Sequence, residues 1–241
     1  MIEREQRGAV SVITLNRPER RNAVSGEACV ALADAVDAAR YDGARAIVLT
    51  GTGPHFCAGA DLSGVEDEHF AQQLRGALRS LHEAPIVTIA AVHGAALGAG
   101  MQLAVACDLR VVAPDARFGI PAAKLGLMVD HWTVQRVALL AGYGPARAVL
   151  LAADEIDAGA AVNLGLASRT GDLESAIAWA ERIAELAPLT IAGHKVALNA
   201  LEPTLDDPAV TDAFRRAWSS DDLREGRAAF AEKRAPRFQG R

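Results

Sequence analysis

Apolar residues in the first half of the chain occur as short, nearly uninterrupted runs that alternate with segments of helical period. Strands that are apolar on both faces are typical of a parallel sheet covered by helices. The runs predict strands over 10–15, 46–50, 86–92 and 109–113. The periodic segments predict helices from an N-cap at Ser25 to about Arg40, over 66–83 and over 101–107.

The strand signal fades after about residue 130, and helical patterns take over. We therefore expect one α/β core over residues 1–190 and a helical C-terminal extension over 191–241. No linker rich in Pro, Gly or Ser divides the sequence. The predicted helices of this half cover 132–141, 145–152, 173–186, 189–201, 209–218 and 223–233.

Composition narrows the classes of function. Hydrophobic residues make up 51% and charged residues 23%, with a net charge of -5, as in an ordinary globular protein. This balance gives no general attraction to nucleic acid or anionic lipid, so an anionic ligand needs a local group of cations. The segment 86–107 is uncharged and long enough to span a bilayer, but its glycines, His93 and Gln102 favour a buried strand, loop and helix.

The cysteines and histidines of the sequence do not indicate a metal site or a set of disulfides. The three cysteines form no CxxC pair, and the six histidines are scattered, so we expect neither a metal site nor a disulfide framework. The charged N-terminus lacks the apolar stretch of a signal peptide, which favours a cytoplasmic location.

Two glycine-rich loops follow predicted strands, at Cys57–Asp61 and His93–Gly100. Small residues let the backbone approach a ligand closely, and a helix start offers free N–H groups. One N–H from each loop would form an oxyanion hole that stabilises an enolate or a tetrahedral intermediate. A phosphate-binding loop, or close packing alone, remains the alternative, although neither dinucleotide nor P-loop spacing is present.

Five segments, spread over nearly the whole chain, resemble the crotonase superfamily of enoyl-CoA hydratases and isomerases. They are LNRPERRNAV at 15–24, HFCAGADLS at 55–63, the run AVHGAALGAGMQLAVACDLRVVAPDARFGIP at 91–121, VNLGLASR at 162–169 and FAEKRAPRFQG at 230–240. The resemblance implies a spiral of ββα turns, a homotrimer or dimer of trimers, and an acyl thioester of coenzyme A as ligand without a further cofactor. Residues 191–241 would then serve trimerisation.

The same resemblance assigns candidate site residues. The two oxyanion N–H groups fall on Ala60 and Ala99, the second of which is usually glycine in the family. Gln102 and Ala122 stand where family hydratases carry catalytic glutamates, a departure shared with similar mycobacterial and actinobacterial paralogues. Neither side chain titrates, and each positioned acid or base typically contributes about 10²–10⁴-fold to the rate, so little hydration is expected.

Asp130 is the carboxylate that the resemblance brings near the thioester. Some superfamily members place a catalytic aspartate there, whereas Asp130 is also a suitable N-cap for the helix predicted after it. For coenzyme A the candidates are Arg20, Arg21, Ala58, Phe230 and Lys233, the last two often reaching a neighbouring subunit in the family.

These residues favour a fatty acyl-CoA-binding or carrier protein with little hydratase activity. The alternatives are an acyl-CoA isomerase or related enzyme that uses Asp130, and a hydratase with residual activity through an ordered water.

Overall fold

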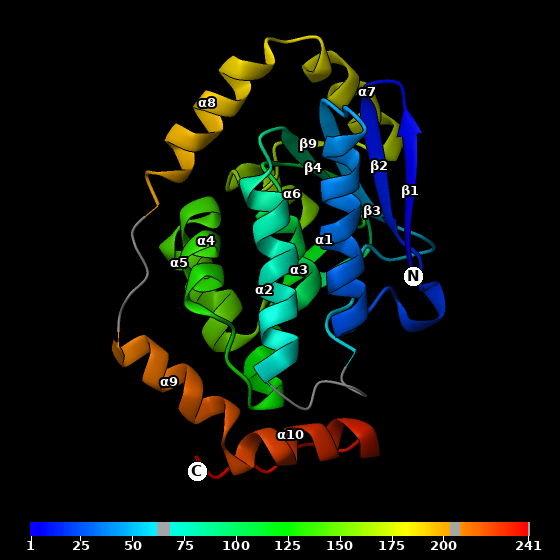
Figure 1. Ribbon diagram of the computed structural model, residues 1–241. Coiled ribbons are helices and arrows are strands. Elements are labelled where there is room, and N and C mark those ends of the chain that lie inside the picture. Colours follow the sequence, from blue (N-terminus) through cyan, green and yellow to red (C-terminus); the bar gives the residue numbers. More distant parts are fainter. Residues whose placement is uncertain (62–67, 203–207, 241) are drawn as a thin grey trace.

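The computed structural model describes residues 1–61, 68–202 and 208–240 (Figure 1). A six-stranded sheet runs in the order β1-β2-β3-β4-β6-β9; β1 is antiparallel to β2, and the other neighbours are parallel. A smaller sheet has the order β5-β7-β8. The strands within the described residues are β1 (Ile2–Arg7), β2 (Val10–Leu15), β3 (Ala46–Gly51), β4 (Val87–Val92), β5 (Ala95–Leu97), β6 (Leu109–Val112), β7 (Arg117–Gly119), β8 (Glu155–Asp157) and β9 (Arg169–Thr170).

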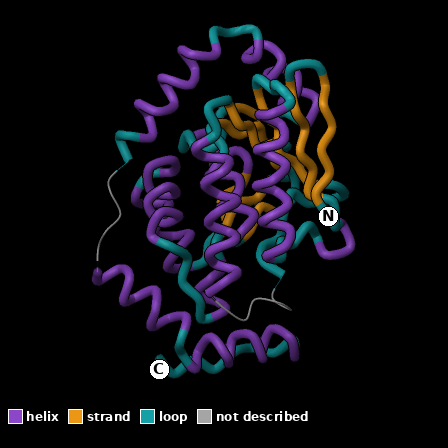
Figure 2. The backbone as a smooth tube through the Cα atoms, in the orientation of Figure 1, coloured by secondary structure: helices purple, strands orange, loops and turns teal. Residues whose placement is uncertain are grey.

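Helices surround the strands, which gather on one side of the view in Figure 2. The helices of the described residues are α1 (Gly26–Tyr41), α2 (Glu68–Glu83), α3 (Ala99–Ala106), α4 (His131–Ala141), α5 (Tyr143–Arg147), α6 (Ala158–Asn163), α7 (Leu173–Ala184), α8 (Pro188–Asn199), α9 (Pro208–Trp218) and α10 (Asp221–Glu232). Short 3-10 turns cover η1 (Pro18–Arg20) and η2 (Pro121–Leu125), and one π turn covers η3 (Ala148–Ala152).

Both faces of the large sheet are buried, as the uninterrupted apolar runs predict. Val10 and Val12 of β2 pack with α7 on one face, whereas Ile13 and Leu15 belong to the main core that α1, α2 and α3 share. Each of these four side chains is at most 3% exposed. Alternate residues of one strand thus stabilise two cores.

The edge strand β1 has no counterpart in the prediction. Its sequence, IEREQR, is largely charged, and only its two end residues are partly buried. The strand forms because its backbone pairs with β2 from Ile2↔Leu15 to Arg7↔Val10, whereas its side chains carry no apolar period. Charged side chains on an exposed edge also discourage pairing with another chain.

The predicted helix limits need two corrections near the glycine loops. Residues 95–97 form β5, and α3 begins at Ala99 rather than at 101, because the first turn of α3 packs directly on the preceding loop. Helix α2 begins at Glu68; residues 66 and 67 of the predicted helix lie outside the described residues.

The last three helices stand apart from the sheet layers (Figure 1). Helix α8 runs along one side of the molecule, and α9 and α10 lie across the end near the C-terminus. Lys195 fixes α8 to the body by donating to Asp108 at 2.7 Å. No helix within the described residues is long and apolar enough to cross a membrane.

Candidate functional site

A cavity of about 580 Å³ lies between the two glycine loops and the C-terminal helices. Its apolar wall comes from α2, η2, the segment after η2 and α9. The main lining residues are Ala58, Gly59 and Ala60 of the first loop, Leu97, Gly98 and Ala99 of the second, Phe70 and Leu74 of α2, Gln102 of α3, Ala122 of η2, Asp130, and Phe214, Trp218 and Phe230 of the last helices. We call it the main cavity.

Backbone hydrogen bonds hold the two loops together. Cys57 N–H donates to Ala95 at 2.9 Å, and Leu97 N–H donates to Cys57 at 3.0 Å. Neither Ala60 N–H nor Ala99 N–H donates to a backbone carbonyl in the described part of the chain. Two unsatisfied donors in one cavity can stabilise a negatively charged oxygen.

Gly100 explains how α3 comes so near the first loop. A Cβ at this position would meet Cys57 O at 2.1 Å, so only glycine permits the approach. Ala99 is the first residue of α3 and keeps a negative φ, so its alanine side chain causes no backbone strain. The positive end of the α3 dipole faces this part of the cavity.

A buried asparagine supports the first loop from below. Asn22 adopts a left-handed φ of 57° and is 1% exposed. Its Nδ2 donates to Thr52 O at 2.8 Å and to His55 O at 2.7 Å. Arg17 meets Asp61, the residue after Ala60, in an ion pair of 3.0 Å. The sequence analysis overlooked these supporting residues, although Asn tolerates this φ better than most residue types.

Gln102, Thr133 and Asp130 form a polar cluster on the cavity wall. Gln102 Nε2 donates to Thr133 Oγ1 at 2.7 Å and to Asp130 Oδ2 at 3.2 Å. Thr133 donates twice to Asp130, from its N–H at 3.0 Å and from Oγ1 at 2.9 Å. Asp130 is therefore the N-cap of α4, as one of the two interpretations of the sequence predicts, and it also lines the main cavity.

The opposite wall is assembled by close packing of α10 on η2. A Cβ on Gly226 of α10 would meet Leu125 O at 2.3 Å, so the helix lies directly against the 3-10 turn that carries Ala122. Helix α9 closes the wall further, because Trp218 Nε1 donates to Met128 O at 2.8 Å and stacks on Phe214 at 5.6 Å between ring centroids. The sequence pattern marks α9 as amphipathic but does not reveal that its apolar side chains face this cavity.

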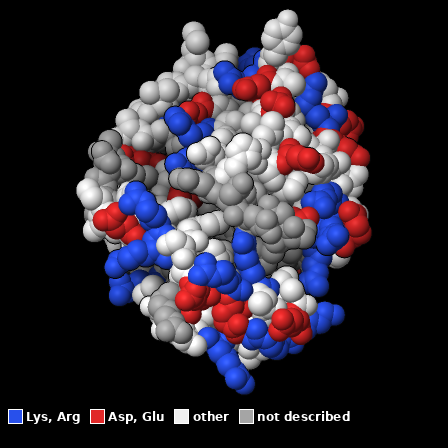
Figure 3. Space-filling model, turned by 60° about the horizontal axis from the view of Figure 1, so that its bottom comes forward, with Lys and Arg blue, Asp and Glu red and all other residues white. Residues whose placement is uncertain are grey.

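Cations border the cavity. Arg20, Arg21 and Arg75 line it. On the face shown in Figure 3, Lys and Arg side chains are interspersed with Asp and Glu. Ala58 and Phe230 also line it, and Phe230 is 62% exposed. Lys233 takes a left-handed φ of 54° as the C-cap of α10 and is not among the lining residues.

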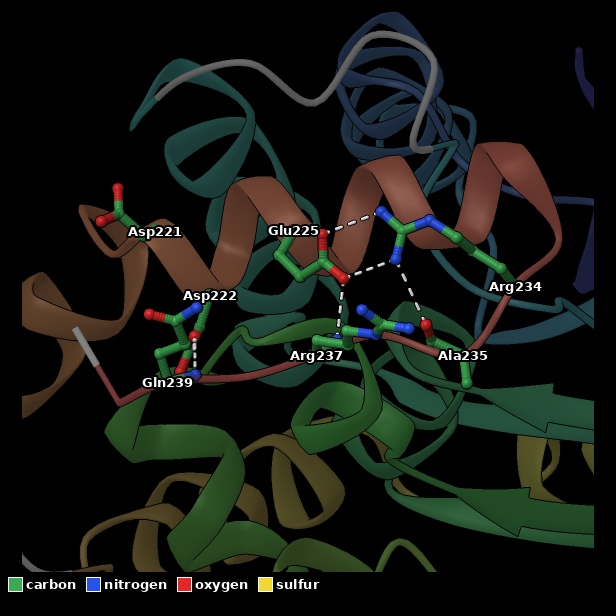
Figure 4. Close-up of a pocket in the computed structure, with 7 residues that line it drawn as sticks. All are labelled: Asp221, Asp222, Glu225, Arg234, Ala235, Arg237 and Gln239. Carbon is green, nitrogen blue, oxygen red and sulfur yellow. Dashed lines mark hydrogen bonds and ion pairs between the residues drawn. The ribbon is translucent and has the colours of Figure 1, made fainter.

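The C-terminal tail is held beneath α10 by two carboxylates (Figure 4). Glu225 accepts from Arg234 at 2.6 and 2.8 Å and from Arg237 N–H at 2.7 Å, and these contacts lower the pKa of Glu225 to about 2. Asp222 accepts from the N–H groups of Gln239 and Gly240. The hollow here measures about 850 Å³, but its carboxylates and Arg234 already have partners, so the main cavity is the better candidate.

The thiols take no part in this chemistry. Cys29, Cys57 and Cys107 are buried and unpaired, and burial raises the pKa of each to about 12. They are small core residues. Among the described residues, no group of three or more His, Cys, Asp and Glu side chains is placed to hold a metal ion.

Comparison with known proteins identifies the family to which the chain belongs. Residues 5–241 match the sequence model of the family described as enoyl-CoA hydratase/isomerase. The chain belongs to this family. It is 47% identical over 247 residues to a probable enoyl-CoA hydratase, echA6, of Mycobacterium tuberculosis, with full coverage of both chains.

Solved structures support the same assignment. EchA1_1 from Mycobacterium paratuberculosis has a TM-score of 0.87 at 34% identity and covers 100% of this chain and 98% of its own. Methylmalonyl CoA decarboxylase has a TM-score of 0.91 at 25% identity, with the same coverage of both chains. The crotonase fold expected from the sequence motifs is confirmed.

Proposed function

We propose that this member of the enoyl-CoA hydratase/isomerase family binds a fatty acyl thioester of coenzyme A and hydrates enoyl thioesters poorly. The observation that carries the proposal is the pair of unsatisfied N–H groups at Ala60 and Ala99 in a cavity whose nearby wall positions hold Gln102 and Ala122. The two donors would polarise the thioester carbonyl. Neither wall side chain would exchange a proton with water.

The cations at the mouth support coenzyme A as the carrier of the acyl group. Arg20 and Arg21 provide the local positive charge that an acidic protein needs to bind phosphates. Ala58 and Phe230 would meet the pantetheine and adenine parts. Lys233, at the C-terminal end of α10, would contact a phosphate. In a homotrimer, this lysine would serve the site of a neighbouring copy. Exposed Leu189, Val196 and Leu198 on α8 support such an assembly.

Ala99 offers a direct test of the oxyanion hole. Proline is tolerated at the first position of a helix, so Ala99→Pro removes the N–H with little damage to α3. The wild type should bind an acyl thioester at least about tenfold more tightly than the matching alkyl thioether, which lacks the carbonyl, and the variant should lose this preference. Isothermal calorimetry measures both ligands. Equal binding of thioester and thioether by the wild type would contradict the hole.

The hydration part is tested with crotonyl-CoA. Loss of the enoyl-thioester absorbance should be very slow, because two catalytic groups that each contribute about 10²–10⁴-fold are missing. A thermal-shift series with acyl-CoAs of rising length should still raise Tm in a concentration-dependent way. Turnover at the rate of an ordinary hydratase would overturn the carrier function.

The second candidate is an acyl-CoA isomerase or related enzyme in which Asp130 moves a proton. Its supporting observation is the carboxylate on the cavity wall, with Gln102 and Thr133 holding its oxygens. A bound acyl-CoA would then exchange α- or γ-protons with deuterated water, and Asp130→Asn would abolish the exchange while binding persists. If the wild type shows no exchange with any acyl-CoA, this candidate fails and the carrier function stands.

A further inference from the structure

A second cavity of about 380 Å³ adjoins the main one. The two share Arg75, Asp130 and Phe214 in their linings, so these three side chains mark the boundary between them. The second cavity lies among α2, the start of α4 and α9, and no residue of the two glycine loops lines it. A chain that fills the main cavity and continues past Asp130 and Phe214 would enter it.

The walls of the second cavity are unsuited to a plain hydrocarbon tail. The lining has four apolar side chains and seven polar or charged ones, which are Arg75, Arg79, His82, Glu83, Asp130, His131 and Thr211. His82 Nδ1 is buried and has no hydrogen-bond partner within the described ranges. Leaving polar groups unpaired against a methyl-ended chain is unfavourable, whereas a polar chain end would satisfy them.

Arg75 is the distinctive side chain at the boundary. It forms no hydrogen bond or ion pair with any other residue that the structure describes. Arg79, one helical turn further along α2, also borders the second cavity but is paired with Glu83 at 3.0 Å. Arg20 and Arg21 line only the main cavity, on the side of the first loop. Arg75 is thus an exposed cation without a protein partner among the described residues, at the edge of the second cavity.

Asp130 does not cancel this cation. Oδ1 of Asp130 accepts from Thr133 N–H at 3.0 Å, and Oδ2 accepts from Thr133 Oγ1 and Gln102 Nε2. Both carboxylate oxygens accept from donors on α3 and α4, and neither pairs with Arg75. The guanidinium of Arg75 keeps its donors for a ligand, and its planar fork matches a carboxylate in two parallel hydrogen bonds.

We propose that Arg75 selects acyl thioesters whose chain carries a second carboxylate at its far end, seated in the second cavity. This inference rests on the proposed acyl-CoA function and names the substrate class of the same site. The thioester end would lie in the main cavity at Ala60 and Ala99. The distal carboxylate would pair with Arg75 beside Thr211.

The test compares two series of coenzyme A thioesters of equal chain length, one methyl-ended and one carboxyl-ended. Wild-type protein should bind the carboxyl-ended member up to about fivefold more tightly at the chain length that reaches Arg75, because an ion pair with an exposed arginine is worth up to about that factor. Arg75→Met keeps the apolar stem and removes the guanidinium, so the preference should vanish while binding of the methyl-ended series persists. Arg40→Met is the control, because this arginine of α1 is also paired with a carboxylate but lines neither cavity, and the variant should keep the preference.

Each outcome decides a different claim. Binding of the methyl-ended series alone supports the proposed function and overturns the inference, as does a preference that survives in Arg75→Met. Absence of binding by both series overturns the proposed function and the inference with it. Raising the salt concentration provides a readout on the wild type alone: the preference for the carboxyl-ended series should shrink, and a salt-independent preference would exclude a charge pair at Arg75.

Discussion

Nε2 of Gln102 lies 3.2 Å from Oδ2 of Asp130, and the same nitrogen donates to Thr133 Oγ1 at 2.7 Å. Gln102 therefore places an uncharged amide next to Asp130, where a glutamate would place a second carboxylate. The effect of a glutamate at position 102 on stability should therefore depend on the charge of Asp130.

Gln102→Glu should lower the free energy of unfolding by about 1–3 kcal/mol at pH 8. Two carboxylates in one site hold a proton more tightly than either does alone, so the native state binds more protons than the unfolded state, and stability should recover as the pH falls toward 5. Urea unfolding at both pH values measures this. The double variant with Asp130→Asn is the control and should remove most of the loss, since Asn also serves as an N-cap. An equal loss at pH 8 and pH 5 would contradict the repulsion.

Gly100→Ala should destabilise the fold by about 1–3 kcal/mol and weaken acyl-CoA binding more than tenfold. The added Cβ would meet Cys57 O at 2.1 Å, which forces α3 away from the first loop. Gly193→Ala in α8 is the matched control, because its Cβ would meet nothing within 4 Å. That change should be neutral or stabilising by up to about 1 kcal/mol. Denaturant unfolding and calorimetry distinguish the two, and equal behaviour would refute the close contact.

The imidazole of His82 makes stability depend on pH. Burial, followed by the charges of Arg136 and Lys195, lowers its pKa to about 4; Glu202 lies 3.5 Å from Nε2 but is also bound by Arg136. The unfolded chain takes up this proton near pH 6.5, before the folded chain does. Stability should therefore be full above about pH 6.5 and fall by on the order of 1–2 kcal/mol as the pH drops to 4.

His82→Phe keeps an aromatic ring against Trp132, whose ring centroid lies 5.3 Å away, and removes the titration. The slope of unfolding free energy against pH between 6.5 and 4.5 should be smaller in this variant than in the wild type. The exposed His194 on α8 is the control, and His194→Gln should leave the slope unchanged. A variant at 82 with the wild-type slope would exclude His82 as the source.

Arg110 caps the end of α3 that lies away from the cavity. Its side chain is buried; Nη1 donates to Cys107 O at 2.7 Å and Ala104 O at 3.2 Å, and the other nitrogens donate to Leu166 O and Asp108 O. Arg110→Met should cost about 3–5 kcal/mol, because several buried carbonyls lose their donors. Arg117→Met, on an exposed pair with Glu155, should cost at most about 1 kcal/mol. Thermal and urea unfolding compare them, and similar losses would show that the buried donors matter little.

The fold could be predicted from the sequence wherever burial produces a regular pattern of apolar residues. The runs at β2, β3, β4 and β6 are apolar on both sides because helices cover both faces of the sheet, and the caps Ser25 and Asp130 marked helix starts. Strand β1 was not predicted because only its backbone pairing with β2, and no apolar pattern, defines it. The start of α3 was predicted two residues too late because its alanines and glycines are compatible with a loop, a strand or a helix.

The site was predictable only in part for a related reason. The motif residues Ala60, Ala99, Gln102 and Ala122 do line one cavity, as their resemblance implied. Arg75 reads in the sequence as a solvated charge on an amphipathic helix, and Phe214 as an ordinary apolar face. Both residues line the cavities only because α2 and α9, which lie far apart in the sequence, come together in the fold.

The hydrogen bonds among Cys57, Ala95 and Leu97 fix the two loops that carry the free N–H groups of Ala60 and Ala99 relative to each other. Under the proposed function, the carbonyl-binding end of the site would be complete as soon as the chain has folded, and no ligand would need to assemble it. Discrimination among thioesters would then depend on the distant walls that α2 and α9 supply. Substitutions in those helices would change the preferred ligand without disturbing the contacts to the carbonyl.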